Sequence, residues 1–122
     1  MKKTQRLLNK STSQEIATNV RVADSMFTRA KGLLGEKSLP EDETLFIQGS
    51  IIPCNSIHTW FMRFPIDVVF VDKSLVVKAV YKNLGPWRMT PPVLGAHSVF
   101  EFAAGALSNK TVSIGDQLYV GD

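Results

Sequence analysis

The stretch Ile66–Leu84 reads IDVVFVDKSLVVKAVYKNL and decides the predicted fold. Ile66–Val71 and Leu75–Leu84 are both rich in β-branched and aromatic residues, which favours strands. Only Asp72-Lys73-Ser74 separates the two runs, and aspartate opens turns because its carboxylate accepts hydrogen bonds from amides further along the chain. The stretch therefore predicts a β-hairpin. Pro65, just before it, lacks the N–H that a ladder needs and indicates a bend, a bulge or a sheet edge.

Apolar and alternating runs predict further strands on both sides of this hairpin. They cover residues 15–22, 44–48, 57–64, 99–103 and 117–120. One short helix is expected near residues 25–34, where Asp24 can cap its start and Gly35 can end it. About seven strands against one helix predict a mainly β fold, a single compact antiparallel β-sandwich or barrel-like domain over residues 1–122.

The composition is that of a globular chain with a hydrophobic core. The 122 residues are 44% hydrophobic and 20% charged, far from the composition of disordered proteins. The net charge is +3, and the first ten residues contain no acid but four basic side chains, Lys2, Lys3, Arg6 and Lys10. We therefore expect residues 1–12 to form a partly frayed, polar and basic terminus.

Several classes of partner and location are disfavoured. The basic terminus lacks the sustained Lys/Arg clusters and interleaved aromatic residues of segments that track phosphates, which argues against nucleic acid as a partner. No apolar run approaches the roughly 20 residues of a membrane span, and we expect no signal peptide. Cys54 has no second cysteine with which to form an internal disulfide, so the cytoplasm is the expected location.

Cys54 and His58 form a Cys-x-x-x-His pair, the minimum needed for a thiolate nucleophile with an imidazole beside it. In an extended segment the two residues would lie roughly 13 Å apart, whereas a turn would bring them into contact. The alternative, which we prefer, is that Cys54 is a small buried apolar residue and His58 a hydrogen-bonded residue at a strand start. Two ligands are too few for a structural zinc site, and no cofactor motif is present, so neither metal nor cofactor is predicted.

Asp67 is an acid inside a strongly apolar stretch and must find hydrogen-bond donors. Arg63, Arg88 or backbone amides are the candidates. A structural role, fixing the bend at Pro65, is preferred over a role as a general base. Arg63 is also a candidate ligand-binding residue, since it lies among aromatic residues that can line a pocket.

The segment Gly85–Pro92 contains three prolines and is predicted to be a loop. Trp87 and Arg88 within it are candidate ligand-binding residues, because loops position binding side chains and an indole among turn formers is seldom a core residue. Glu101 alternates with two phenylalanines, so we expect its side chain to face solvent or an arginine such as Arg88.

The chain resembles a bacterial and archaeal family known as domain of unknown function 192. The central block Pro53–Asp72 carries most of the resemblance, and it reads PCNSIHTWFMRFPIDVVFVD. The other matching pieces follow in the family's order: Arg29–Gly35, Pro86–Arg88, Val99–Gly105 and Ile114–Asp116. The resemblance implies a single mainly β domain and supplies no activity, so no catalytic role is carried over.

Three functions follow as hypotheses. The first is a small binding or accessory domain that uses the Cys54–Asp67 segment and the Trp87–Arg88 loop to bind a small molecule or a protein. The second is a cysteine-dependent hydrolase or transferase with Cys54 as nucleophile and His58 as base. The third, which the reasons above disfavour, is nucleic-acid binding through the basic N-terminus; it requires a steeply salt-dependent affinity that is lost when residues 1–10 are removed. The oligomeric state does not follow from the sequence.

The reactivity of Cys54 separates the first two hypotheses. In the folded protein we expect its alkylation rate to rise with a midpoint at about pH 8.5, because an inert structural cysteine has no cation to stabilise its thiolate. The measurement is the rate of alkylation against pH. A midpoint lower by about one unit or more, restored to the ordinary value in His58→Ala, would contradict the structural interpretation and favour the enzyme.

Overall fold

A computed structural model describes residues 5–23, 42–49 and 64–121. These residues form eight strands and, within the same ranges, no helix. The helix expected near residues 25–34 and most of the strand expected over 57–64 lie outside the described residues. The strands are β1 (Arg6–Asn9), β2 (Gln14–Ala17), β3 (Asn19–Ala23), β4 (Glu43–Ile47), β5 (Ile66–Val71), β6 (Val77–Leu84), β7 (Ser98–Ala103) and β8 (Leu118–Gly121).

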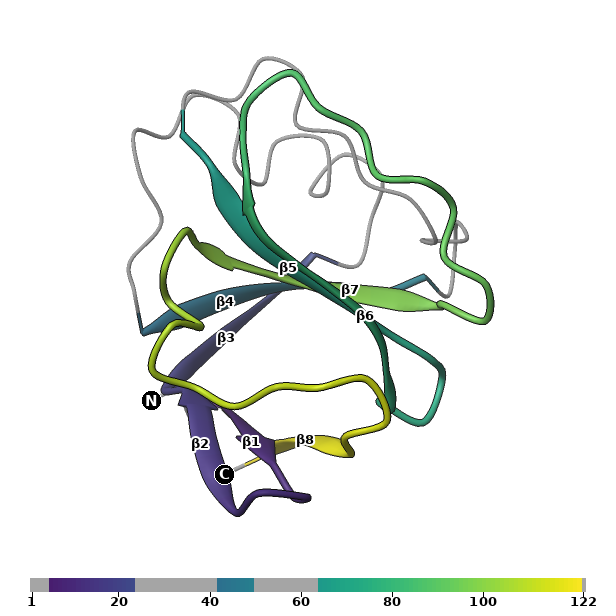
Figure 1. Ribbon diagram of the computed structural model, residues 1–122. Helices are drawn as coiled ribbons and strands as arrows, with labels where there is room; N and C mark the ends of the chain where they lie inside the picture. Colours follow the sequence, from purple (N-terminus) through teal and green to yellow (C-terminus); the bar gives the residue numbers. More distant parts are fainter. Residues whose placement is uncertain (1–4, 24–41, 50–63, 122) are drawn as a thin grey trace.

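The strands form two sheets in one compact domain, which confirms the predicted mainly β class (Figure 1). One sheet has three strands in the order β2-β1-β8, and the other has five in the order β3-β4-β7-β5-β6. One pairing differs from the antiparallel prediction, because β3 and β4 run parallel. A parallel pair needs a long crossover, and residues 24–42 supply one. Within the described ranges, no helix is long and apolar enough to cross a membrane.

The predicted hairpin is present as β5 and β6, which pair antiparallel. Asp72 holds the turn: its Oδ1 accepts hydrogen bonds from the amides of Ser74 and Val76 at 2.8 and 3.0 Å. Its backbone carbonyl accepts a third, from the amide of Leu75 at 3.0 Å. Leu75 adopts a positive φ of 64°, so the turn closes without the glycine that such a conformation usually requires. The aspartate therefore performs the role that the sequence predicted.

The single strand expected over residues 15–22 is two strands, one in each sheet. The chain bends at Thr18, whose amide donates to the carbonyl of Asp42 at 2.8 Å and whose hydroxyl also donates to Asp42. Ile16 and Val20, on either side of the bend, are both buried in the core between the sheets. The alternation thus holds for Ile16 and Val20 only: Val22 is 40% exposed and Ala17 is buried, because the bend changes which side chains face the core.

The prediction of a frayed terminus over residues 1–12 is wrong for Arg6–Asn9. These residues form β1, the central strand of the three-stranded sheet, and pair with β2 and β8. Leu7 is fully buried, and so is Asn9, whose amide group donates to the Thr111 carbonyl and to the Asp116 carboxylate, both at 2.9 Å. The basic residues do not prevent strand formation, because Arg6 and Lys10 lie on the outer face of the sheet while Leu7 and Asn9 lie on the buried face.

The main core lies between the two sheets. Phe46 of β4 stacks on Phe100 of β7 with ring centroids 4.3 Å apart. The remaining members come from both sheets and from Leu107 in the connection before β8, and they are Leu7, Ile16, Ala17, Val20, Val69, Val71, Val77, Phe102, Leu107 and Leu118. This core fixes the three-stranded sheet against one face of the five-stranded sheet.

A second apolar cluster covers the other face of the five-stranded sheet, which we call the far face. All of its buried members belong to that sheet: Leu45, Ile47, Ile66, Val68, Phe70 and Val99. Every residue of β5 is buried, and so are the first five residues of β7. These two inner strands are therefore mostly apolar on both faces, because both faces are covered.

Replacing Leu7 with alanine is expected to lower the free energy of unfolding by about 3 kcal/mol, because it leaves a cavity in the main core. Leu8→Ala is the matched control: Leu8 is half-buried on the outer face, and we expect it to cost less than about 1 kcal/mol. Urea denaturation of both variants tests this. Equal, small losses would mean that β1 is not part of the core.

Candidate functional site

The far face and the connection that follows β6 form the candidate site. The connection spans residues 85–97 and rises above the side of the five-stranded sheet that faces away from the three-stranded sheet (Figure 1). Val93 and Ala96 of this connection pack against the far-face cluster. Candidate side chains on the connection and on the far face therefore belong to one region of the molecule.

Glu101 lies in the middle of the far face and not in solvent. It is 5% exposed, and its register partners are Leu45 on β4 and Val68 on β5. The alternation did place Glu101 opposite Phe100 and Phe102, but it could not reveal that both faces of β7 are buried. The expectation that the side chain faces solvent is wrong, and a pairing with an arginine stays a prediction. Burying a carboxylate among aliphatic side chains costs free energy unless the carboxylate is paired or hydrogen-bonded. Glu101 therefore makes this row of the sheet a candidate for function.

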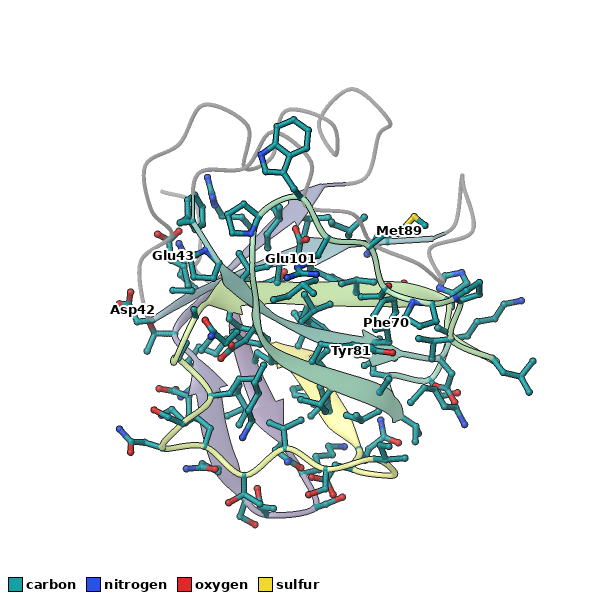
Figure 2. All side chains as sticks on the ribbon, turned by 45° about the horizontal axis from the view of Figure 1, so that its top comes forward. Asp42, Glu43, Phe70, Tyr81, Met89 and Glu101 are labelled. Carbon is teal, nitrogen blue, oxygen red and sulfur yellow. The ribbon has the colours of Figure 1, made fainter. Side chains whose placement is uncertain are left out.

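Charged residues continue this row toward the edge of the sheet. Arg21 of β3 is the register partner of Leu45, and its Nε lies 3.6 Å from Oε1 of Glu43. Asn19 donates a hydrogen bond of 2.9 Å to the same carboxylate oxygen. In Figure 2, Glu43 and Glu101 lie on the side of the five-stranded sheet away from the three-stranded sheet. The sequence analysis missed this group, because only the strand pairing brings its members together.

Asp67 lies on β5 with 1% of its surface exposed, and backbone amides surround its carboxylate. Oδ1 accepts a hydrogen bond from the amide of Asn83 at 2.8 Å, and Oδ2 accepts two, from Gly105 at 3.1 Å and Leu107 at 3.2 Å. Asn83 has a positive φ of 57° and lies where the β5–β6 register shifts, so its amide faces the carboxylate and not the ladder. Backbone amides were among the predicted donors to Asp67. Contacts of this kind are the ones expected if Asp67 has a structural role and is not a general base.

The loop predicted over residues 85–92 is confirmed. Trp87 is 61% exposed and Met89 is 63% exposed, and Leu94 further along is almost wholly exposed. Arg88, between the first two, is exposed as well. Trp87 has a positive φ of 61°, a conformation that a bulky side chain rarely adopts. The candidate residues Trp87 and Arg88 thus stand on the surface, as the sequence indicated.

The other candidates lie outside the described residues. These are Cys54, His58 and Arg63, and whether the thiol and the imidazole meet stays a prediction. The part of the chain that the structure describes contains no group of three or more His, Cys, Asp and Glu residues able to hold a metal ion.

The described residues contain one imidazole–hydroxyl contact that the sequence analysis did not consider. Ser98 Oγ lies 2.8 Å from Nδ1 of His97 and accepts a hydrogen bond from the amide of Gly49 at 3.2 Å. Ser98 is only 3% exposed. The contact ties the segment after β4 to the start of β7, and a buried hydroxyl of this kind is not open to a substrate.

Comparison with known proteins gives the family. Residues 7–120 match the family described as DUF192, Uncharacterized ACR. The chain belongs to this family. A UPF0127 protein from Thermococcus sibiricus is 34% identical over 113 residues, which cover 92% of this chain and 72% of that protein. A UPF0127 protein from Pyrococcus furiosus is 34% identical over 115 residues, which cover 92% and 95% of the two chains. The resemblance seen in the sequence is confirmed.

Two solved structures share the fold of this DUF192 chain. A protein of unknown function from Novosphingobium aromaticivorans superposes with a TM-score of 0.79 at 18% identity, covering 95% of this chain and 83% of that one. A putative transcription regulator from Sinorhizobium meliloti gives 0.77 at 22% identity, covering 95% and 91%. At these identities the likeness shows the fold alone, and the family itself is uncharacterised.

Replacing Asp67 with alanine is expected to cost about 3 kcal/mol of stability, because three backbone amides lose their acceptor and two of them, those of Gly105 and Leu107, belong to the connection after β7. Chemical denaturation measures the loss. The control is Asp42→Ala, which removes an exposed carboxylate that accepts one hydrogen bond, from the Thr18 hydroxyl; the same hydroxyl also donates to the Asp42 backbone carbonyl, so we expect a loss of less than about 1 kcal/mol. If the two variants were equally stable, the carboxylate of Asp67 would not hold the loops.

Proposed function

We propose that this protein is a binding module for a protein partner, and that its contact surface is formed by Trp87, Arg88, Met89 and Leu94, here called the loop surface. The single observation that carries the proposal is the exposed indole of Trp87 on a backbone with positive φ. The Cys54–Asp67 half of the surface expected from the sequence lies mostly outside the described residues, so the proposal rests on the loop.

The left-handed backbone conformation of Trp87 costs free energy, and the partial burial of its side chain does not offset that cost. A non-glycine residue in the left-handed region costs of order 1–3 kcal/mol, and such residues cluster at functional sites. An indole usually repays a cost by burying its large apolar surface, but Trp87 keeps 61% of its surface exposed. A partner that covers the indole would supply the missing burial.

The chemistry of the loop surface suits a protein better than a small molecule. Small molecules bind in concave sites that enclose most of their surface, whereas these side chains project from a loop. Tryptophan and arginine are the residues most enriched among the energetic anchors of protein interfaces, and methionine adapts to irregular partners. Arg88 adds a preference for a carboxylate on the partner.

The prolines of the loop favour binding for a further reason. Pro86 precedes Trp87, and Pro91 and Pro92 separate Met89 from Leu94. Each fixed proline φ reduces the conformational freedom that the loop must lose when a partner binds.

A panel of peptides tests the proposal. The panel combines apolar anchors with acidic residues, and each peptide has a scrambled counterpart of the same composition. We expect some members to shift the ¹H–¹⁵N resonances of residues 86–95, and we expect the double variant Trp87→Ala/Arg88→Ala to weaken their binding by about tenfold or more, as the loss of interface anchors does.

The control variant is Ile114→Ala, which removes another exposed apolar side chain from a different loop and should leave binding unchanged. If the double variant bound every peptide as tightly as the unmodified protein, or if no peptide shifted the loop resonances, the loop surface would be the wrong site.

The strain itself is testable without a ligand. Trp87→Gly should not lower the free energy of unfolding, because relief of the left-handed conformation, of order 1 kcal/mol, offsets the greater freedom of glycine in the unfolded chain. Arg88→Gly, at a position without a positive φ, should cost about 0.5–1 kcal/mol. A loss at position 87 as large as at 88 would show that the tryptophan conformation is not strained.

A further inference from the structure

The outer face of the three-stranded sheet brings together residues from opposite ends of the chain. In the β1–β8 register, Leu8 lies opposite Tyr119 and Arg6 lies opposite Gly121. Lys10 follows on the same face, since its amide donates to the carbonyl of Gln117 at 2.8 Å. The opposite face of the same strands carries Leu7 and the other core residues, so this outer face turns away from the domain.

The ring of Tyr119 lies across the backbone at Gly121. A Cβ atom placed on Gly121 would come within 2.5 Å of Cε1 of the ring and 2.7 Å of its Oη. Gly121 is therefore buried beneath the ring, while Tyr119 keeps 45% of its surface exposed. The part of the ring that is not against Gly121 is an aromatic surface, and the ammonium of Lys10, which lies over the ring, has to move aside before a base can stack on it.

Two cations flank this ring. Nζ of Lys10 is 5.0 Å from the ring centroid, and Arg6 neighbours the glycine that the ring covers. The guanidinium of Arg6 pairs with Glu15 at 2.8 Å, and both side chains of that pair are more than a third exposed. Exposed ion pairs and cation–π contacts are weak, so both cations can exchange their present partners for a stronger anion.

We propose that this outer face binds single-stranded nucleic acid. A base stacks on the Tyr119 ring, and Lys10 and Arg6 contact the flanking phosphates. The sequence argued against nucleic acid because the basic terminus has neither sustained Lys/Arg clusters nor interleaved aromatic residues; strand pairing supplies the aromatic residue, Tyr119 of β8, beside Arg6 and Lys10. Among the described residues of this face, Arg6 and Lys10 give two positive charges against the carboxylate of Glu15, the register partner of Leu8, so the face favours an anion.

The geometry favours single strands over duplexes. A flat ring on an exposed sheet can stack only on a base that is free of its neighbours, and such stacking tolerates any base sequence. A duplex offers only its phosphates to this face, so it would gain the ionic contacts without the stacking.

The test uses a fluorescein-labelled oligothymidylate of about ten nucleotides, with binding followed by fluorescence anisotropy at about 50 mM and 150 mM salt. We expect saturable binding that weakens with salt, and a duplex of the same length should bind less tightly. Tyr119→Phe keeps the ring and should bind like the unmodified protein, whereas Tyr119→Leu should bind about fivefold more weakly or worse.

A second pair of matched variants tests how much positive charge contributes to binding. Lys10→Gln should reduce the slope of log affinity against log salt by about 0.7, the value for one phosphate contact on a single strand. Lys82→Gln removes the same charge from β6, in the other sheet, and should leave the slope unchanged.

Three results would overturn the proposal: no binding at the lower salt concentration, equal affinity of the leucine and phenylalanine variants, or equal slopes for the two lysine variants. Thermal melting of each variant checks that it is folded. Because neither variant set touches the loop surface, failure here leaves the proposed protein-binding function standing.

Discussion

The structure depends on one constraint, the burial of β5 and β7 on both faces. These strands form the middle of the five-stranded sheet, so the main core lies on one side and the far-face cluster on the other. Their side chains alternate between two apolar environments and not between core and water. This explains why five of the six residues of IDVVFV are apolar, and why the carboxylates of Asp67 and Glu101 must be satisfied within the protein.

The two proposed surfaces lie at the periphery of this framework, and each depends on it in a different way. The loop surface is joined to the far face through Val93 and Ala96, so the sheet positions the loop that presents Trp87. The outer face of the three-stranded sheet is held by Leu7, which packs in the main core on the reverse side of the same strand as Arg6. The strands thus position both surfaces, one directly on β1 and β8 and the other through the connection after β6. The exposed side chains of these surfaces are not part of the core.

Local chemistry was predictable and long-range pairing was not. Asp72 acts within a few residues of itself, so the hairpin and its turn followed from the sequence, as did the exposed loop around Trp87. One of the two partners of β1 is β8, at the other end of the chain, and no local pattern in Arg6–Asn9 predicts this pairing. The parallel β3–β4 pair and the buried position of Glu101 depend in the same way on which strands become neighbours. The sequence therefore predicted the part of the candidate site that lies on one loop, Trp87 and Arg88. It did not predict the part that several strands bring together, Arg21, Glu43 and Glu101.

The strands β5 and β7, which are buried on both faces, form the stable framework, and the loop surface is held on it more loosely. Native-state hydrogen exchange measured residue by residue tests this claim most directly. We expect the amides within β5 and β7 to exchange only through global unfolding, with the highest protection in the chain, while the amides of the non-proline residues of 86–95 exchange through local opening at much lower free energy. Equal protection of the loop and of β7, or faster exchange in β7 than in the loop, would contradict it.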